Sequence, residues 1–90
     1  MTRAKKIKLL AEYLGINENR SFWFDPYSHE ADCFAVLYRC KVETLCNCDG
    51  SRSVFVTDAC AAVRVRTRAR FRAAIVDAAV ANVLRERGEE

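Results

Sequence analysis

The spacing of apolar residues changes twice along the chain, and this change limits the folds open to it. In residues 3–14 and 29–39, apolar side chains recur at the helical spacing of three and four residues. From Lys41 they alternate with polar ones, as in a strand with one buried face, and after Arg68 the helical spacing returns. On 90 residues, this order predicts one α+β domain with a single core.

Two stretches in the first half of the chain carry helix signals. Residues 3–14 place their apolar side chains on one face and are followed by Gly15, a residue favoured just after a helix. Residues 29–39 follow Ser28, a good N-cap, and have acidic side chains in the first turn, where the helix dipole favours them. We expect one face of this second helix to consist of Ala31, Phe34, Ala35 and Tyr38.

The last predicted helix, residues 68–87, is rich in alanine, free of Gly and Pro, and preceded by Thr67 as a cap. Its apolar positions form two neighbouring stripes: Val76, Val80, Val83 and Leu84 in one, and Phe71, Ile75 and Ala78 in the other. Because contact with one sheet needs a narrower apolar sector, we expect this helix to touch two layers or a second subunit.

Between the helices, the sequence predicts a small antiparallel sheet. Residues 41–57 form two β-rich runs around Asp49-Gly50, the strongest hairpin signal in the chain. Residues 61–66 alternate valine with arginine and predict a third strand with one basic side. Two or three strands packed with about three helices give an α+β fold, and helices on both faces would make an α/β/α sandwich.

Residues 21–27 hold four aromatic side chains beside the only proline, which predicts an extended segment whose rings supply much of the core. The run Trp23-Phe24-Asp25-Pro26, the helix and hairpin after it, and the closing RAAIVDAA helix resemble the phage helix-sheet-helix (ABA) sandwich domains. The resemblance covers roughly residues 20 to 85. It implies a sandwich fold and a bacteriophage or prophage origin, and it brings no catalytic residues.

Positive charge is gathered in two clusters, although the net charge is only +3. If the third strand continued to residue 72, five arginines would form one cationic ridge suited to phosphate backbones, whereas a helix starting near residue 68 would split that ridge. Arginine is unfavourable at a helix start, so some of these side chains need acidic partners or an anionic ligand. A solvated face with internal ion pairs is the alternative. The candidate partner-binding residues are Lys5, Lys6, Lys8, Arg64, Arg66, Arg68, Arg70 and Arg72.

The chain has five cysteines, and an odd number cannot all pair in disulfides. This favours a reducing compartment. Buried free thiols pack as small apolar groups, and we expect this of most of them, with Cys48 near the turn the most exposed. Zinc is the alternative, and its candidate ligands are Cys40, Cys46, Cys48 and Cys60. The paired C-x2-C spacing typical of zinc sites is absent, so we expect no metal.

The chain offers little for catalysis, cofactors or membranes. His29 is the only histidine and forms no recognisable triad, and the glycines at 15, 50 and 88 make no phosphate-binding loop. Neither a membrane-spanning stretch nor a signal peptide is predicted. We therefore expect a non-enzymatic protein of a bacterial cytoplasm, without cofactor, as a monomer or homodimer.

Two functions fit these observations. The first is a non-catalytic interaction module, phage-encoded or prophage-encoded, that binds a host protein or nucleoprotein complex and acts as an anti-CRISPR-like inhibitor of host defence. The size and the implied origin suggest that role, not particular residues. The alternative is a protein that binds nucleic acid without sequence specificity through the ridge from Arg64 to Arg72.

Overall fold

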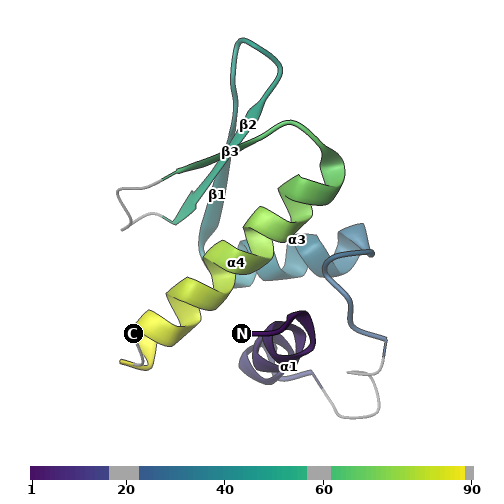
Figure 1. Ribbon diagram of the computed structural model, residues 1–90. Coiled ribbons are helices and arrows are strands. Elements are labelled where there is room, and N and C mark those ends of the chain that lie inside the picture. The colour runs from purple at the N-terminus through teal and green to yellow at the C-terminus, as the bar shows by residue number, and fades with distance from the viewer. Residues whose placement is uncertain (17–22, 57–61, 89–90) are drawn as a thin grey trace.

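The computed structural model describes residues 1–16, 23–56 and 62–88. Three helices and three strands follow one another along the chain (Figure 1). They are α1 (Arg3–Leu14), α3 (Glu30–Arg39), β1 (Val42–Cys46), β2 (Arg52–Val56), β3 (Val63–Val65) and α4 (Arg68–Glu86). The predicted α+β class is confirmed, with the predicted helices and strands in the predicted order.

The sheet is antiparallel in the order β1-β2-β3. The predicted hairpin turns around Gly50, which takes a φ of +86° that side chains rarely adopt. Its register pairs Val42 with Val56 and Cys46 with Arg52, and the predicted third strand pairs Arg52 with Val65. This register places the arginine at the start of β2 beside the end of β3.

Helices cover one face of the sheet only (Figure 1). On that face Val42, Val54, Val56 and Val65 are buried in the core. The residues between them project to the other side and are exposed or half-buried: Glu43, Leu45, Ser53, Phe55 and Arg64. None of the described helices packs on this second face. Its two charged residues, Glu43 and Arg64, would need partners if they were covered. The described chain therefore has two layers, and the α/β/α alternative is not formed.

Helix α4 lies at the centre of the molecule and contacts the sheet on one side and both α1 and α3 on the others. Seven of its residues are buried: Ala74, Ile75, Val76, Ala79, Val80, Asn82 and Val83. The broad apolar sector is thus explained by contact with the sheet on one side and with two neighbouring helices on the others. None of the described helices meets the length and hydropathy needed to cross a bilayer.

Helix α1 has the predicted bounds and packs against α4 and α3 through Leu10 and Ala11. Thr2 caps its start by accepting a hydrogen bond from the Lys5 amide at 3.3 Å. Gly15 ends it in the left-handed conformation, with φ of 72°. The basic first helix is therefore part of the fold.

Helix α3 begins one residue later than predicted and turns a different face inward. His29, not Ser28, is the N-cap, and its side chain makes no capping hydrogen bond. The buried residues are Cys33 and Val36, followed by Cys40 at the C-cap. The predicted face exists but lies outward, with all four of its residues exposed: Ala31, Phe34, Ala35 and Tyr38.

The aromatic segment before α3 contributes to the core in part. Phe24 and Tyr27 are buried, and Pro26 is fully enclosed. Trp23 is 72% exposed, so its ring does not supply core volume as expected. Residues 21 and 22 lie outside the described ranges.

Candidate functional site: an arginine pocket at the start of helix α4

The arginine series does not form a single ridge. Helix α4 begins at Arg68, and Thr67 caps it by accepting a hydrogen bond from the Arg70 amide at 3.2 Å. Strand geometry therefore ends at Val65, and the alternation that would align all five arginines is lost within the helix.

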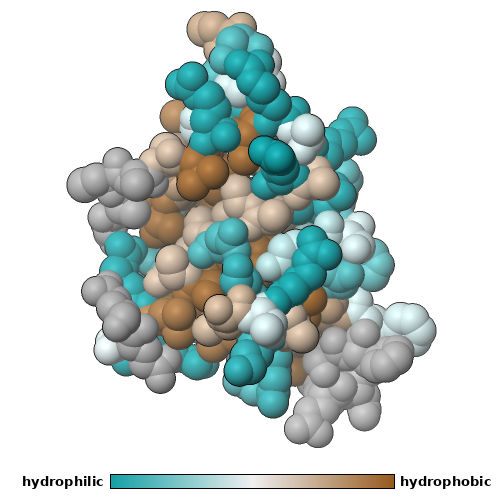
Figure 2. Space-filling model, in the orientation of Figure 1, coloured by the Kyte–Doolittle hydropathy of each residue, from teal (hydrophilic) through white to brown (hydrophobic). Residues whose placement is uncertain are grey.

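The helix divides the arginines between two cavities. Arg66, Arg68 and Arg72 line a cavity of about 370 Å³ between the start of α4, the hairpin and α3. Arg64 and Arg70 line a second, more open cavity of about 480 Å³ between α4 and the strands β2 and β3. Figure 2 shows apolar surface over α4 and the adjoining sheet, interrupted by hydrophilic side chains.

The first cavity gains a fourth arginine from a distant part of the chain, Arg52 of β2. We call the cavity lined by Arg52, Arg66, Arg68 and Arg72 the arginine pocket. Two aromatic side chains, Phe34 and Phe71, and one carboxylate, Glu30, also line it. Sequence reasoning missed Arg52, although its alternation in phase with Val54 and Val56 places a charge on the inner face of the sheet, which is a usable signal.

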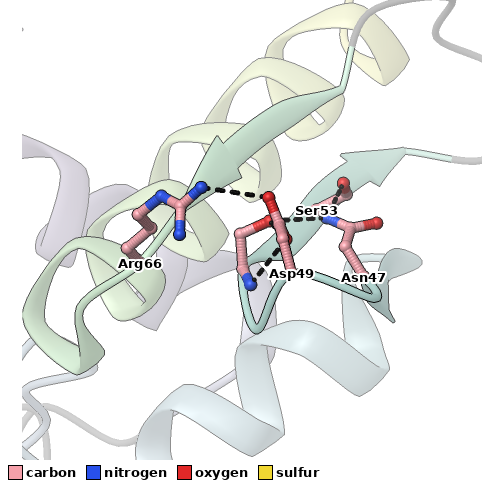
Figure 3. Close-up of polar contacts among 5 residues, drawn as sticks. Asn47, Asp49, Ser53 and Arg66 are labelled. Carbon is pink, nitrogen blue, oxygen red and sulfur yellow. Dashed lines mark hydrogen bonds and ion pairs between the residues drawn. The ribbon is translucent and has the colours of Figure 1, made fainter.

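Arg66 is held in place by the tip of the hairpin. Its Nη2 donates to Asp49 Oδ2 at 3.0 Å (Figure 3). The other carboxylate oxygen of Asp49 accepts from the Ser51 amide at 3.0 Å and from the Ser51 hydroxyl at 2.5 Å. The pKa of Asp49 is lowered to about 2. The hydrogen bond from the Ser51 hydroxyl is the largest cause, the one from the Ser51 amide is the next, and nearby arginines contribute less.

Further side-chain hydrogen bonds stiffen the same loop. The Asn47 amide donates to the hydroxyls of Ser51 and Ser53, each at 3.0 Å (Figure 3). The Asn47 backbone amide also donates to the Ser51 carbonyl at 2.8 Å. The hairpin tip, which lines the pocket at Gly50, is therefore held in one conformation by its own hydrogen bonds.

The other three arginines of the pocket differ in the interactions that their guanidinium groups make. Arg72 Nε donates to the Tyr27 carbonyl at 2.6 Å. The Arg52 guanidinium lies over the Phe71 ring, 5.1 Å from its centre. Within the described ranges, neither Arg52 nor Arg68 forms an ion pair with a carboxylate. Among the described residues, two guanidinium groups thus line the pocket without an ion pair to a carboxylate.

The predicted lysine cluster does not join this pocket. Lys6 pairs with Asp77 of α4 at 2.5 Å, and this hydrogen bond raises the pKa of Lys6. Lys5 and Lys8 are exposed on α1, which lies across α3 and α4 from the sheet (Figure 1). Lys6 therefore holds α1 to α4, and the two clusters form no common basic surface.

The candidate zinc ligands are not brought together. Cys33 and Cys40 are buried, whereas Cys46 and Cys48 are both exposed near the hairpin tip. Cys46 is therefore an exception to the expected burial of most thiols, because none of the described helices covers that end of β1 (Figure 1). Cys60 lies outside the described residues, and within them no group of three or more metal-binding side chains is formed.

His29, the only histidine, pairs with a carboxylate three residues away. Its Nδ1 lies 3.2 Å from Asp32 Oδ2 on the exposed first turn of α3. Asp32 Oδ2 also accepts from the Asp25 amide at 3.0 Å. This arrangement ties the start of α3 to the segment before it.

Protein-family models, curated proteins and solved structures were each compared with the chain, and none matches it. The resemblance to the phage sandwich domains therefore rests on its sequence motifs alone.

Proposed function

We propose that the protein is a non-catalytic interaction module that binds an acidic protein partner at the arginine pocket. The observation that carries this proposal is the gathering of four arginines around one cavity, where Glu30 is the single carboxylate among the described lining residues. Arginine favours such a role because its planar group donates two parallel hydrogen bonds to a carboxylate. Partly enclosed cavities also strengthen these bonds by excluding water.

A protein partner is favoured over a nucleic acid by the local character of the charge. Arg64 and Arg70 line the other cavity, and Lys6 is occupied by Asp77. A nucleic-acid backbone needs a track of cations along its phosphates, whereas an acidic side chain or short acidic segment needs one cationic site.

Affinity capture with charge-reversed variants tests the proposal. Arg52→Glu with Arg68→Glu reverses two charges in the pocket, and Lys5→Glu with Lys8→Glu reverses the same number on α1. The wild type and the α1 variant should recover the same acidic protein from bacterial lysates treated with nuclease, and the pocket variant should not. Equal recovery by both variants would refute the proposal.

Binding of single-stranded nucleic acid is the second candidate, favoured by the two phenylalanine rings beside the guanidinium groups. Bases stack on such rings while arginines neutralise phosphates. Fluorescence anisotropy with labelled single-stranded DNA or RNA should then show binding that weakens steeply with salt and is lost in the pocket variant. The absence of binding at low salt would exclude nucleic-acid binding.

Inhibition of a host defence complex by a phage-encoded protein is the particular module that the sequence resemblance implies. It stays a prediction, as do the bacterial cytoplasm and the absence of catalysis. Capture from lysates of a bacterium that carries the gene or its prophage would identify such a complex directly.

A further inference from the structure

The outward face of α3 is apolar where a surface helix is normally polar. Phe34 is 62% exposed and Tyr38 is 82% exposed, one helical turn apart on the same face. The helix already has a core face, formed by Cys33 and Val36. The exposed rings therefore do not serve packing within the described fold, and exposed apolar patches of this kind mark interaction surfaces.

Small residues flank the rings and leave the helix backbone open to close approach. Ala31 and Ala35 are both exposed on this side of α3. Helices pack at axis separations of roughly 8–10 Å, and small side chains between large ones let a second helix reach such a distance. We call Ala31, Phe34, Ala35 and Tyr38 the aromatic face.

The aromatic face is continuous with the arginine pocket. Phe34 belongs to both, and Glu30, one turn earlier on α3, also lines the pocket. Tyr38 lies one turn beyond Phe34, about 6 Å farther along the helix axis. A bound segment would meet cations near the start of α3 and aromatic rings toward its end.

We infer that the partner presents an amphipathic helix to this surface, with apolar side chains on Phe34 and Tyr38 and acidic side chains at the end that enters the pocket. The inference rests on the proposed function and specifies its partner. Charge complementarity fixes the orientation of the bound helix, since its acidic end must lie against Arg52 and Arg68. Apolar anchors at i, i+3 or i+4, and i+7 are the usual form of helix recognition.

Selection from a library of random peptides tests this inference without a known partner. The probe is a displayed library of peptides of about 14 residues, roughly four helical turns, selected against the full chain. Enriched peptides should carry large apolar residues at helical spacing and Asp or Glu gathered at one end. Enrichment without that pattern would overturn the inference.

Variants of the chain then separate the two levels of the proposal. A synthetic peptide of the enriched sequence should bind about tenfold or more weakly to Phe34→Ala with Tyr38→Ala, and to Arg52→Glu with Arg68→Glu, as expected for losing interface anchors. The Lys5→Glu, Lys8→Glu variant should bind it normally. The replaced rings are exposed, so thermal unfolding should confirm that the aromatic variant is folded.

Each other result contradicts a stated part of the account. Loss in the pocket variant alone would refute the helix-binding inference and leave the proposed function standing. Loss in neither variant would refute both. Displacement of the peptide by single-stranded DNA, or a homodimer that the aromatic variant disrupts, would show that another occupant takes this surface.

Discussion

The Arg66 guanidinium donates to the Asp49 carboxylate across 3.0 Å, joining the junction of β3 and α4 to the tip of the β1-β2 hairpin. Because Asp49 also accepts two hydrogen bonds from Ser51, its carboxylate is held by the hairpin turn as well as by Arg66. The hairpin turn thus positions a pocket arginine 17 residues farther along the chain.

The first prediction concerns the titration of Asp49. Its pKa is lowered to about 2, so its contribution to stability is complete above the ordinary value of 3.8 and is lost as the pH falls toward 2. The Ser51 amide resonance should therefore titrate with a midpoint near 2. Replacing Ser51 by Ala should raise the midpoint, and a wild-type midpoint near 3.8 would contradict the network.

The second prediction concerns a buried amide between α4 and the end of α3. Asn82 is 5% exposed and donates to the Cys40 carbonyl at 2.8 Å. Asn82→Ala should lower the free energy of unfolding by roughly 1–3 kcal/mol, because the carbonyl loses its buried partner. Urea denaturation measures the change. Arg85 donates to Asn82 Oδ1 at 2.6 Å, so Arg85→Ala removes a different hydrogen bond of Asn82 and leaves the one to Cys40 intact. An equal loss of stability in that variant would contradict the assignment.

The third prediction concerns thiol reactivity. Burial raises the pKa of Cys40 to about 11 and also raises that of Cys33. Iodoacetamide at about pH 8 should label exposed Cys46 and Cys48 in the folded protein, and Cys33 and Cys40 only after unfolding, because the thiolate is the reactive form. Peptide mapping distinguishes the sites. Rapid labelling of Cys40 in the folded protein would refute the packing of α3.

The fourth prediction tests the docking of α1. Leu10 is fully buried, so Leu10→Ala should lower the free energy of unfolding by roughly 2–5 kcal/mol. Lys6→Ala removes only the pair with Asp77, whose side chain is 59% exposed, and should cost less than about 1 kcal/mol. Urea denaturation compares the two. A negligible effect of Leu10→Ala would mean that α1 is not part of the folded core.

Local signals predicted the helices and strands well. Gly15 and Thr67 mark the end of α1 and the start of α4, and both make the expected caps. Asp49-Gly50 marks the hairpin, and the valine alternation marks β3. These features depend on a few neighbouring residues, which the sequence contains.

The candidate site was harder to predict because it depends on pairing between distant residues. Sequence alternation favoured a ridge of five arginines, but the start of α4 turns Arg70 toward the second cavity. Strand register, which local patterns do not fix, brings Arg52 beside Val65. The outward face of α3 was also not predictable, since its buried face uses Cys33 and Val36 while the larger rings remain exposed.

The most direct test of the central claim is an NMR titration of the full chain with a short polyglutamate peptide, following the arginine Nε–Hε resonances. If the arginine pocket is the binding site, the Nε–Hε resonances of Arg52 and Arg68 should shift progressively at moderate salt, while the amide resonances of Lys5 and Lys8 should stay in place. Shifts confined to α1, or spread evenly over all basic residues, would contradict the arginine pocket as the binding site.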